Sequence, residues 1–245
     1  MKKTLIAIAL AAMMAPAWGA EVVSSNIVGY EKVSLTDATY KMSGIQFVGV
    51  GEVVAGLNDL FCGEIAYGTE IMFLDQTSGA YITYKYLEEA YDEDADEFLP
   101  GWGAGDEYYV TDPVPAGSGF WFCPHSDGDV TQAGQVTTSD SVSISIPAGA
   151  YTMVSNPYPT GFNPNSVQWD ENLAYGTMIM TLDASGAYIT YKYLEEAYDE
   201  DADTFAPGWG DGDEYLVKSD IAAAGEGFWV YAPVATSLTV QSPLK

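Results

Sequence analysis

One stretch of 19 residues, SGAYITYKYLEEAYDEDAD, occurs twice in the chain, at 78–96 and again at 185–203. Related segments flank both copies: YGTEIMFLD and YGTMIMTLD precede them, and PGWGAGDEYYV and PGWGDGDEYLV follow them. A later pair, AGSGFWF and AGEGFWV, keeps nearly the same spacing. Two copies are too few to stack into a solenoid, so the repeat predicts two tandem modules of about 110 residues each.

The local pattern within each module predicts β-strands. Residues 141–146 (SVSISI) alternate polar and apolar side chains, as a half-buried strand does. The segment AYITYKY is rich in β-branched and aromatic residues and follows a turn sequence, DQTSG or DASG, so we expect it to be the second arm of a hairpin. Only YLEEAYDE holds good helix formers, and it is short and dense in like charge. The expected fold class is all-β, with one β-sandwich-like or barrel-like module per repeat.

The first 20 residues have the composition of a secretory signal peptide. Lys2 and Lys3 precede an apolar run, and small residues suited to a signal peptidase follow it. The run is too short to span a membrane, so we expect export to the extracellular space, the cell surface or the periplasm, without membrane insertion. The expected organisation is a signal peptide at 1–20, a first β module at 21–134 and a second at 135–245.

The chain is strongly acidic and contains no arginine. It has 35 Asp and Glu residues against eight lysines, which gives a formal net charge of −27. Such a chain repels phosphate backbones and anionic membranes, so nucleic acid is not expected as a partner. Disorder is not expected either, since 48% of the residues are apolar and 13% are aromatic.

Short motifs in each module resemble a β-rich module of bacterial secreted and cell-surface proteins. In that family a strand ending in Asn-Pro-Tyr-Pro precedes a hairpin, and a Gly-x-Gly-Phe-Trp strand closes the unit. The matching residues are Asn156, Pro157, Tyr158, Pro159, Gly225, Gly227, Phe228 and Trp229 in the second module, and Gly117, Gly119, Phe120 and Trp121 in the first. The first module has SGIQF in place of the Asn-Pro motif. The resemblance implies a non-catalytic surface or matrix module and no particular ligand.

Both cysteines, Cys62 and Cys123, lie in the first module, and the second module has neither. A bonded pair would be lost together in this way, and export permits oxidation. A bridge closing roughly sixty residues would stabilise the module by about 4 kcal/mol through loop entropy. We therefore predict a disulfide, the alternative being two unpaired buried thiols.

Each copy of the repeated stretch ends in alternating aspartates. Carboxylates at alternate positions of a loop can converge on one centre, and Ca²⁺ prefers six to eight oxygen ligands of this hard type. The pattern is not that of an EF-hand, so the predicted calcium site is a looser loop site; the alternative is a solvated acidic loop. The candidate ligands are Asp92, Asp94, Asp96, Asp106, Glu107, Asp199, Asp201, Asp203, Asp213 and Glu214.

Tyrosines crowd the repeated strand, and a tryptophan lies between glycines in the segment that follows it. An exposed indole beside tyrosines and carboxylates could stack on sugar rings; alternatively, each tryptophan closes the core of its module. The candidate contact residues are Tyr81, Tyr84, Tyr86, Trp102, Tyr188, Tyr191, Tyr193 and Trp209.

No arrangement of residues predicts catalysis: the only histidine, His125, has no counterpart in the second module, and no nucleophile elbow or zinc spacing is present. We expect a secreted, non-enzymatic, Ca²⁺-stabilised structural or assembly protein, such as a filament or layer subunit, that contacts itself or other surface proteins. The alternative is an extracellular carbohydrate-binding module that uses the Tyr- and Trp-rich hairpin. The segment 21–35 is expected either to complete a neighbour's sheet by strand addition or to pair within its own module.

Overall fold

The computed structural model describes residues 27–105, 108–171, 173–212 and 214–244. The predicted signal peptide at 1–20 and three of the candidate calcium ligands, Asp106, Glu107 and Asp213, lie outside these ranges. Within the ranges, no helix has the length and apolar composition needed to cross a lipid bilayer.

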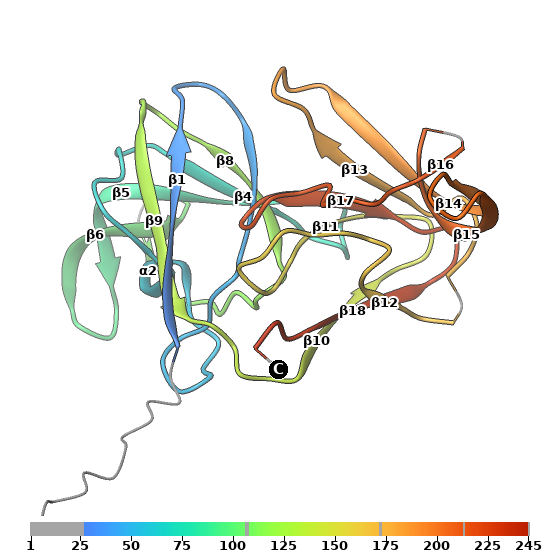
Figure 1. The fold of residues 1–245 in the computed structure, drawn as a ribbon. Coiled ribbons are helices and arrows are strands. Elements are labelled where there is room, and N and C mark those ends of the chain that lie inside the picture. Colours follow the sequence, from blue (N-terminus) through green and yellow to red (C-terminus); the bar gives the residue numbers. More distant parts are fainter. Residues whose placement is uncertain (1–26, 106–107, 172, 213, 245) are drawn as a thin grey trace, which may run out of the picture.

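The described chain is built almost entirely of β-strands, which form two modules (Figure 1). The first contains β1 (Val28–Leu35), β2 (Lys41–Gly44), the short helix α2 (Leu57–Leu60), β3 (Phe61–Cys62), β4 (Glu70–Leu74), β5 (Tyr81–Asp92), β6 (Glu97–Ala104), β7 (Tyr108–Tyr109), β8 (Gly119–Cys123) and β9 (Gly128–Gln135). The second contains β10 (Ser141–Ile146), β11 (Tyr151–Ser155), β12 (Gln168–Trp169), β13 (Met178–Leu182), β14 (Tyr188–Asp199), β15 (Thr204–Asp211), β16 (Tyr215–Leu216), β17 (Gly227–Tyr231) and β18 (Thr236–Gln241). The connection between the modules is therefore 136–140, just after the expected boundary.

Each module pairs a six-stranded sheet with a three-stranded sheet. The orders are β2-β8-β4-β5-β6-β7 and β1-β9-β3 in the first module, and β11-β17-β13-β14-β15-β16 and β10-β18-β12 in the second. Matching the strands in sequence order makes the two sets of sheets the same. The prediction of two β-sandwich-like modules is confirmed, and the repeat in sequence is also a repeat in topology.

Aromatic side chains fill the core of the first module. Phe61 of β3 contacts Phe120 and Phe122 of β8, with ring centroids 5.8 and 5.6 Å apart. Trp102 of β6 lies 6.1 Å from Phe61 and is completely buried. These edge-on contacts join the two sheets by burying large apolar surfaces between them.

The predicted disulfide is wrong, because Cys62 and Cys123 are both free thiols. Phe61 and Phe122 face each other across the core, and side chains alternate along a strand. The next residue of each strand, Cys62 or Cys123, therefore lies on the outer face of its own sheet. The two thiols are on opposite sides of the module, and Cys62 is exposed rather than buried.

The N-terminal strand pairs within its own module. All eight residues of β1 are paired antiparallel with β9, from Val28 opposite Gln135 to Leu35 opposite Gly128. Figure 1 shows the two strands side by side. Of the two alternatives for this segment, the structure therefore has the internal pairing for residues 28–35.

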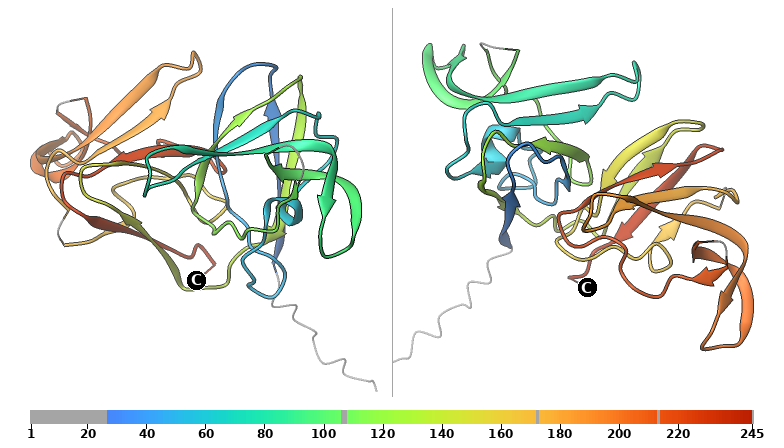
Figure 2. Two further views of the ribbon diagram at one scale, coloured as in Figure 1. Left: turned by 180° about the vertical axis from the view of Figure 1, so that it is seen from behind. Right: turned by 90° about the horizontal axis from the view of Figure 1, so that it is seen from above.

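The two modules are joined by a reciprocal pair of backbone hydrogen bonds. The N–H of Gly44 donates to the carbonyl of Gly225, and the N–H of Ser155 donates to the carbonyl of Gly117, both over 2.9 Å. Gly44 and Ser155 end the equivalent strands β2 and β11, whereas Gly117 and Gly225 precede the equivalent strands β8 and β17. The modules are thus related by an approximate two-fold axis that passes through this junction (Figure 2).

A small apolar cluster covers the junction. Met42 of β2, Met153 of β11 and Trp229 of β17 are buried together, and Trp121 and Leu182 pack against them. The cluster draws side chains from both modules, so its burial stabilises their docking.

One carboxyl group at the junction has a strongly shifted pKa. Glu31 of β1 reaches the turn of the second module that contains Gly225 and Glu226. Burial raises the pKa of Glu31 to about 7; Lys41 acts to lower it, and the Glu226 carboxylate acts to raise it. Gln46, in the amide orientation that suits its neighbours, donates to Glu31 Oε2 over 3.0 Å.

This shift predicts a pH-dependent stability. An unfolded glutamate titrates near 4.5 and folded Glu31 near 7, so between these values the folded state binds more protons. The free energy of unfolding should therefore fall as the pH rises from about 4.5 to 7, by an amount on the order of 1 kcal/mol because the carboxyl is partly solvated. Urea denaturation at pH 5, 6, 7 and 8 measures this slope, which Glu31→Gln should reduce; an identical slope in Glu31→Gln would contradict the assignment.

Candidate functional site

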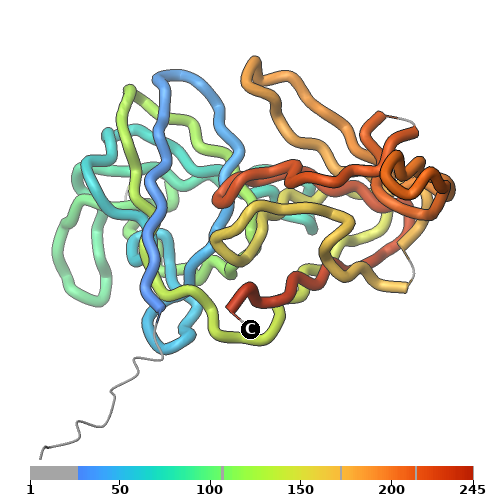
Figure 3. Tube along the Cα trace, viewed as in Figure 1, coloured from blue at the N-terminus to red at the C-terminus, as the bar shows by residue number. Residues whose placement is uncertain are grey.

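The repeated stretch forms the same long hairpin in both modules. In each, a 12-residue strand (β5 or β14) runs through a β-bulge, at Leu87/Ala90 or Leu194/Ala197, and then turns back into β6 or β15. A bulge bends a strand and increases its twist, so the part beyond it curls away from the sandwich. The two curled ends lie at opposite ends of the molecule, as Figures 1 and 3 show.

The aspartates of the repeat build the turn at each end. Asp92 Oδ1 accepts hydrogen bonds from the N–H groups of Asp94 and Ala95, over 3.0 and 3.2 Å. The Tyr91 hydroxyl donates to Asp96 over 2.7 Å, and this bond raises the pKa of Tyr91. The second module repeats these contacts with Asp199, Asp201, Ala202, Tyr198 and Asp203. Part of the acidic pattern therefore has a structural role, because these carboxylates fix the turn.

The described carboxylates do not form the calcium site that the sequence predicts. Within the described ranges, no three His, Cys, Asp or Glu side chains lie close enough together to hold a metal ion. Three candidate ligands, Asp106, Glu107 and Asp213, lie outside those ranges. The calcium site therefore stays a prediction that depends on these three residues.

A lysine neutralises the acidic turn of the second module. Lys218 Nζ lies 2.6 Å from Asp199 Oδ1 and 2.6 Å from Asp201 Oδ2. Its hydrogen bond to Asp199 lowers the pKa of that carboxyl. The equivalent residue of the first module, 107 positions earlier, is Thr111. The first acidic turn therefore has the same aspartates without this built-in cation.

An exposed cluster of aromatic rings adjoins each acidic turn. In the first module the Tyr91 ring lies 5.1 Å from Phe98 and 6.4 Å from Tyr108, and Phe98 is 64% exposed. The second module repeats the cluster with Tyr198, Phe205 and Tyr215, at 5.0 and 6.0 Å, with Phe205 65% exposed. We call these clusters the first and second aromatic ends. Contiguous exposed apolar surface of this kind is typical of interaction sites.

The sequence-based set of contact residues contains none of these six rings, although Tyr91 and Tyr198 belong to the tyrosine-rich repeated strand. A signal was present, because a phenylalanine stands four residues before the tryptophan in both copies although the residue after it differs. When two copies of an acidic hairpin share an apolar residue but differ at the residues beside it, that position belongs either to the core or to a contact surface. Only the structure shows that these two phenylalanines face solvent.

The two tryptophans proposed as a sugar-stacking surface are not available for contact. Trp102 is 0% exposed and Trp209 is 1% exposed. Both are core residues: Trp102 packs 5.4 Å from Tyr86, and Trp209 packs 5.7 Å from Tyr193. The structure therefore favours the alternative that each tryptophan closes the core of its module.

The tyrosines of the repeated strand divide between two environments. Tyr84, Tyr86, Tyr191 and Tyr193 are partly buried against the core. Tyr81 and Tyr188, at the start of the strand, are about half exposed. In addition, Tyr86 stacks on the exposed Tyr67 with the rings 9° from parallel, and Tyr193 stacks on the exposed Tyr175 at 10°. Each module therefore presents one stacked tyrosine pair. The sequence-based set of contact residues omitted the exposed member of each pair, Tyr67 or Tyr175.

An asparagine in each module fixes the strand that carries the tryptophan. The Asn58 amide donates to the carbonyls of Trp102 and Val110, over 3.1 and 2.9 Å, and accepts from the Trp102 N–H over 2.7 Å. In the second module, Asn165 makes the same three bonds to Trp209 and Val217. Sequence reasoning missed this pair because the surrounding residues have diverged. The detectable signal was the spacing, since Asn58 and Asn165 stand 107 positions apart, as do the two copies of the repeated stretch.

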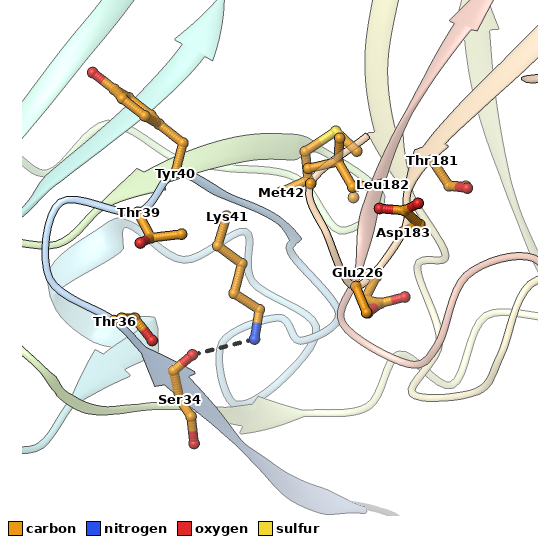
Figure 4. A pocket seen from close by; sticks show the side chains of 13 residues that line it. Ser34, Thr36, Thr39, Tyr40, Lys41, Met42, Thr181, Leu182, Asp183 and Glu226 are labelled. Atoms are coloured by element: carbon orange, nitrogen blue, oxygen red, sulfur yellow. Dashed lines mark hydrogen bonds between the residues drawn. The ribbon is translucent and has the colours of Figure 1, made fainter. Parts of the chain in front are cut away.

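A pocket of about 290 Å³ opens beside the junction between the modules (Figure 4). Lys41 of the first module forms one wall, with Nζ donating to the carbonyl of Ser34 over 3.3 Å. Asp183 and Glu226 of the second module belong to the opposite wall. Opposite charges on the two walls favour the docked arrangement of the modules.

Comparisons of the chain with protein-family models, with curated proteins and with solved structures find no match. The resemblance to a secreted β module therefore stays a prediction that rests on short motifs. The Asn-Pro-Tyr-Pro motif has a structural role here, because the Asn156 amide bonds to Thr160 and Gly161 while Tyr158 is fully buried. Both modules expose an aromatic end beside an acidic turn, and these surfaces are the ones best suited to contacts with other molecules.

Proposed function

We propose that the chain is a secreted, non-catalytic structural or assembly protein of the cell surface or extracellular matrix, and that its two aromatic ends are its contact surfaces. One observation carries this proposal. The same exposed group of three aromatic rings, next to the same acidic turn, occurs twice and at opposite ends of one docked unit.

This arrangement suits a filament or layer subunit. A subunit with one self-complementary patch closes into a dimer, whereas two equivalent patches that face apart allow each added copy to present a new end. The reciprocal bonds between Gly44 and Gly225 and between Ser155 and Gly117 hold the modules together, which fixes the direction between the ends.

The charge of the chain sets the conditions for assembly. At a formal net charge of −27, copies repel one another until salt screens the charge or a cation binds. We therefore expect assembly to require moderate salt or Ca²⁺. A Ca²⁺ effect beyond that of Mg²⁺ at equal ionic strength would support the predicted calcium site.

Sedimentation velocity of the mature protein tests the proposal. The unaltered protein should form species larger than a dimer as salt or Ca²⁺ is raised. Phe98→Ser leaves one intact end, so it should stop at the dimer, and Phe98→Ser with Phe205→Ser should remain monomeric. Tyr30→Ser is the matched control, because Tyr30 is 80% exposed but lies on β1, outside both aromatic ends. A protein that stays monomeric under all conditions, or a double variant that assembles normally, would refute the proposal.

The stacked tyrosine pairs favour a second candidate, carbohydrate binding. Tyr67 and Tyr175 are about half exposed and lie flat on Tyr86 and Tyr193, so each presents a ring face to solvent. Aromatic ring faces of this kind can pack against the apolar face of a sugar. A glycan-binding module should remain monomeric in the sedimentation experiment and should be retarded on polysaccharide affinity gels. Replacing Tyr67 and Tyr175 by alanine should abolish that retardation.

A further inference from the structure

The second module holds an ammonium group at a place where the first module has an open concavity. We propose that the acidic turn of the first module is a receptor for an alkylammonium group, namely the lysine side chain of a partner protein. This inference rests on the proposed function in that the lysine comes from outside the chain. It goes further by naming the chemistry of the partner at one end.

The two acidic turns have the same carboxylates in the same arrangement. Residues 78–96 and 185–203 have identical sequences, and the aspartate that caps the turn accepts the same two backbone hydrogen bonds in both modules. In the second module two of these carboxylates hold Lys218 Nζ at 2.6 Å each. The equivalent carboxylates of the first module, Asp92 and Asp94, have no lysine partner within the described ranges. The second module therefore shows that aspartates arranged in this way can hold an ammonium group.

The modules differ at two positions that face this turn. Thr111 replaces Lys218, which removes the internal ammonium, and Tyr109 replaces Leu216, which adds an aromatic ring. The space left in the first module is a concavity of about 490 Å³ lined by Asp92, Glu93, Asp94, Tyr108, Tyr109 and Thr111. Both differences suit a cation supplied from outside: one clears the position, and the other supplies a ring face that attracts organic cations.

Alkylammonium fits this lining better than a bare metal ion. An ammonium group has three donors, which carboxylates and a threonine hydroxyl can accept, and its alkyl stem can pack on tyrosine rings. Ca²⁺ requires six to eight oxygen ligands, and among the described residues no three carboxylates lie close enough together to hold a metal ion. The strongly negative charge of the chain also favours the approach of a basic segment.

The test is a nuclear magnetic resonance titration of the mature protein with an acetylated and amidated Gly-Lys-Gly peptide. We expect saturable shifts confined to residues 92–94 and 108–111 at low salt. Thr111→Lys should place an internal ammonium group in the site and so lower the affinity for the peptide at least tenfold. Lys218→Thr should do the opposite, adding a second set of shifts at Asp199 and Asp201.

Three controls make the outcome decisive. The same peptide with its lysine Nε acetylated should cause no shifts, and Asp94→Asn should weaken binding even if Thr111→Lys does not fold. Ca²⁺ and Mg²⁺ are titrated separately, and shifts at this turn with Ca²⁺ but not with the lysine peptide would overturn the proposal. Equal binding of the peptide by the unaltered protein and by Thr111→Lys would also overturn it. Peptide binding requires no self-association. A protein that does not bind the peptide can therefore still assemble as proposed, and a protein that does not assemble can still bind the peptide.

Discussion

Replacing Gly119 and Gly227 together by alanine is expected to separate the two modules without unfolding either one. A Cβ at Gly119 would lie 2.7 Å from both the N and the O of Val154, and a Cβ at Gly227 would lie 2.4 Å from the carbonyl oxygen of Ser43. In each case the obstructing atoms belong to the backbone of the other module, so no side chain can move aside to make room. Overpacking of this kind typically costs about 1–3 kcal/mol per site. The strands must move apart, and the reciprocal hydrogen bonds across the junction should then break.

Small-angle X-ray scattering measures this separation as an increase in the radius of gyration. Limited proteolysis should show faster cleavage in the connection at 136–140, since that segment is no longer held between docked modules. Gly128→Ala is the matched control, because a Cβ there meets no atom within 4 Å. An unchanged radius of gyration in the double variant would contradict this prediction, because the junction would then accommodate both methyl groups without opening.

Removing either asparagine that supports a tryptophan strand should be among the most destabilising single changes in its module. Asn58→Ala deletes three hydrogen bonds and leaves groups of Trp102 and Val110 without their partner; Asn165→Ala does the same to Trp209 and Val217. Each buried group left unsatisfied costs about 1–3 kcal/mol, so the expected loss is about 3 kcal/mol or more. Urea denaturation followed by tryptophan fluorescence measures it.

The conservative change Asn58→Asp separates the hydrogen bonds from the shape of the side chain. It keeps the acceptor for the Trp102 N–H but loses both donors, and it places a charge beside two carbonyl oxygens. We expect Asn58→Asp to fold less stably than the unaltered protein, like Asn58→Ala. A loss below about 1 kcal/mol in Asn58→Ala would show that solvent replaces the amide at this position.

The repeat predicted the modules correctly and the alternating pattern predicted the hairpins correctly, because each can be recognised directly in the sequence. The segment YLEEAYDE shows the limit of local propensity. Its helix formers lie in β5, where pairing with β6 and a bulge between Leu87 and Ala90 override their preference. The turn before the strand followed the prediction, since Asp75 accepts hydrogen bonds from Thr77 and Ser78 within it.

The wrong predictions concern which way side chains face. Sequence reasoning placed Gly-Trp-Gly in a loop and left its tryptophan either exposed or in the core; the segment is part of β6, and the side chains of Tyr109 and Leu87 lie against its glycines. A Cβ at Gly101 would lie 2.4 Å from the Tyr109 ring, and one at Gly103 would lie 2.5 Å from Leu87. The disulfide prediction failed similarly, since the joint absence of two cysteines says nothing about which face of a strand each occupies. The junction between the modules could not be predicted at all, because its contacts join residues that no local pattern relates.

The approximate two-fold axis between the modules relates two halves that can mutate independently. A true homodimer must carry any mutation in both halves, but two modules encoded in one chain can change separately. Thr111 and Tyr109 in one half, against Lys218 and Leu216 in the other, are changes of this kind. The molecule therefore keeps a symmetric contact between its halves while its two ends can be told apart, so one end can acquire a partner that the other end does not bind.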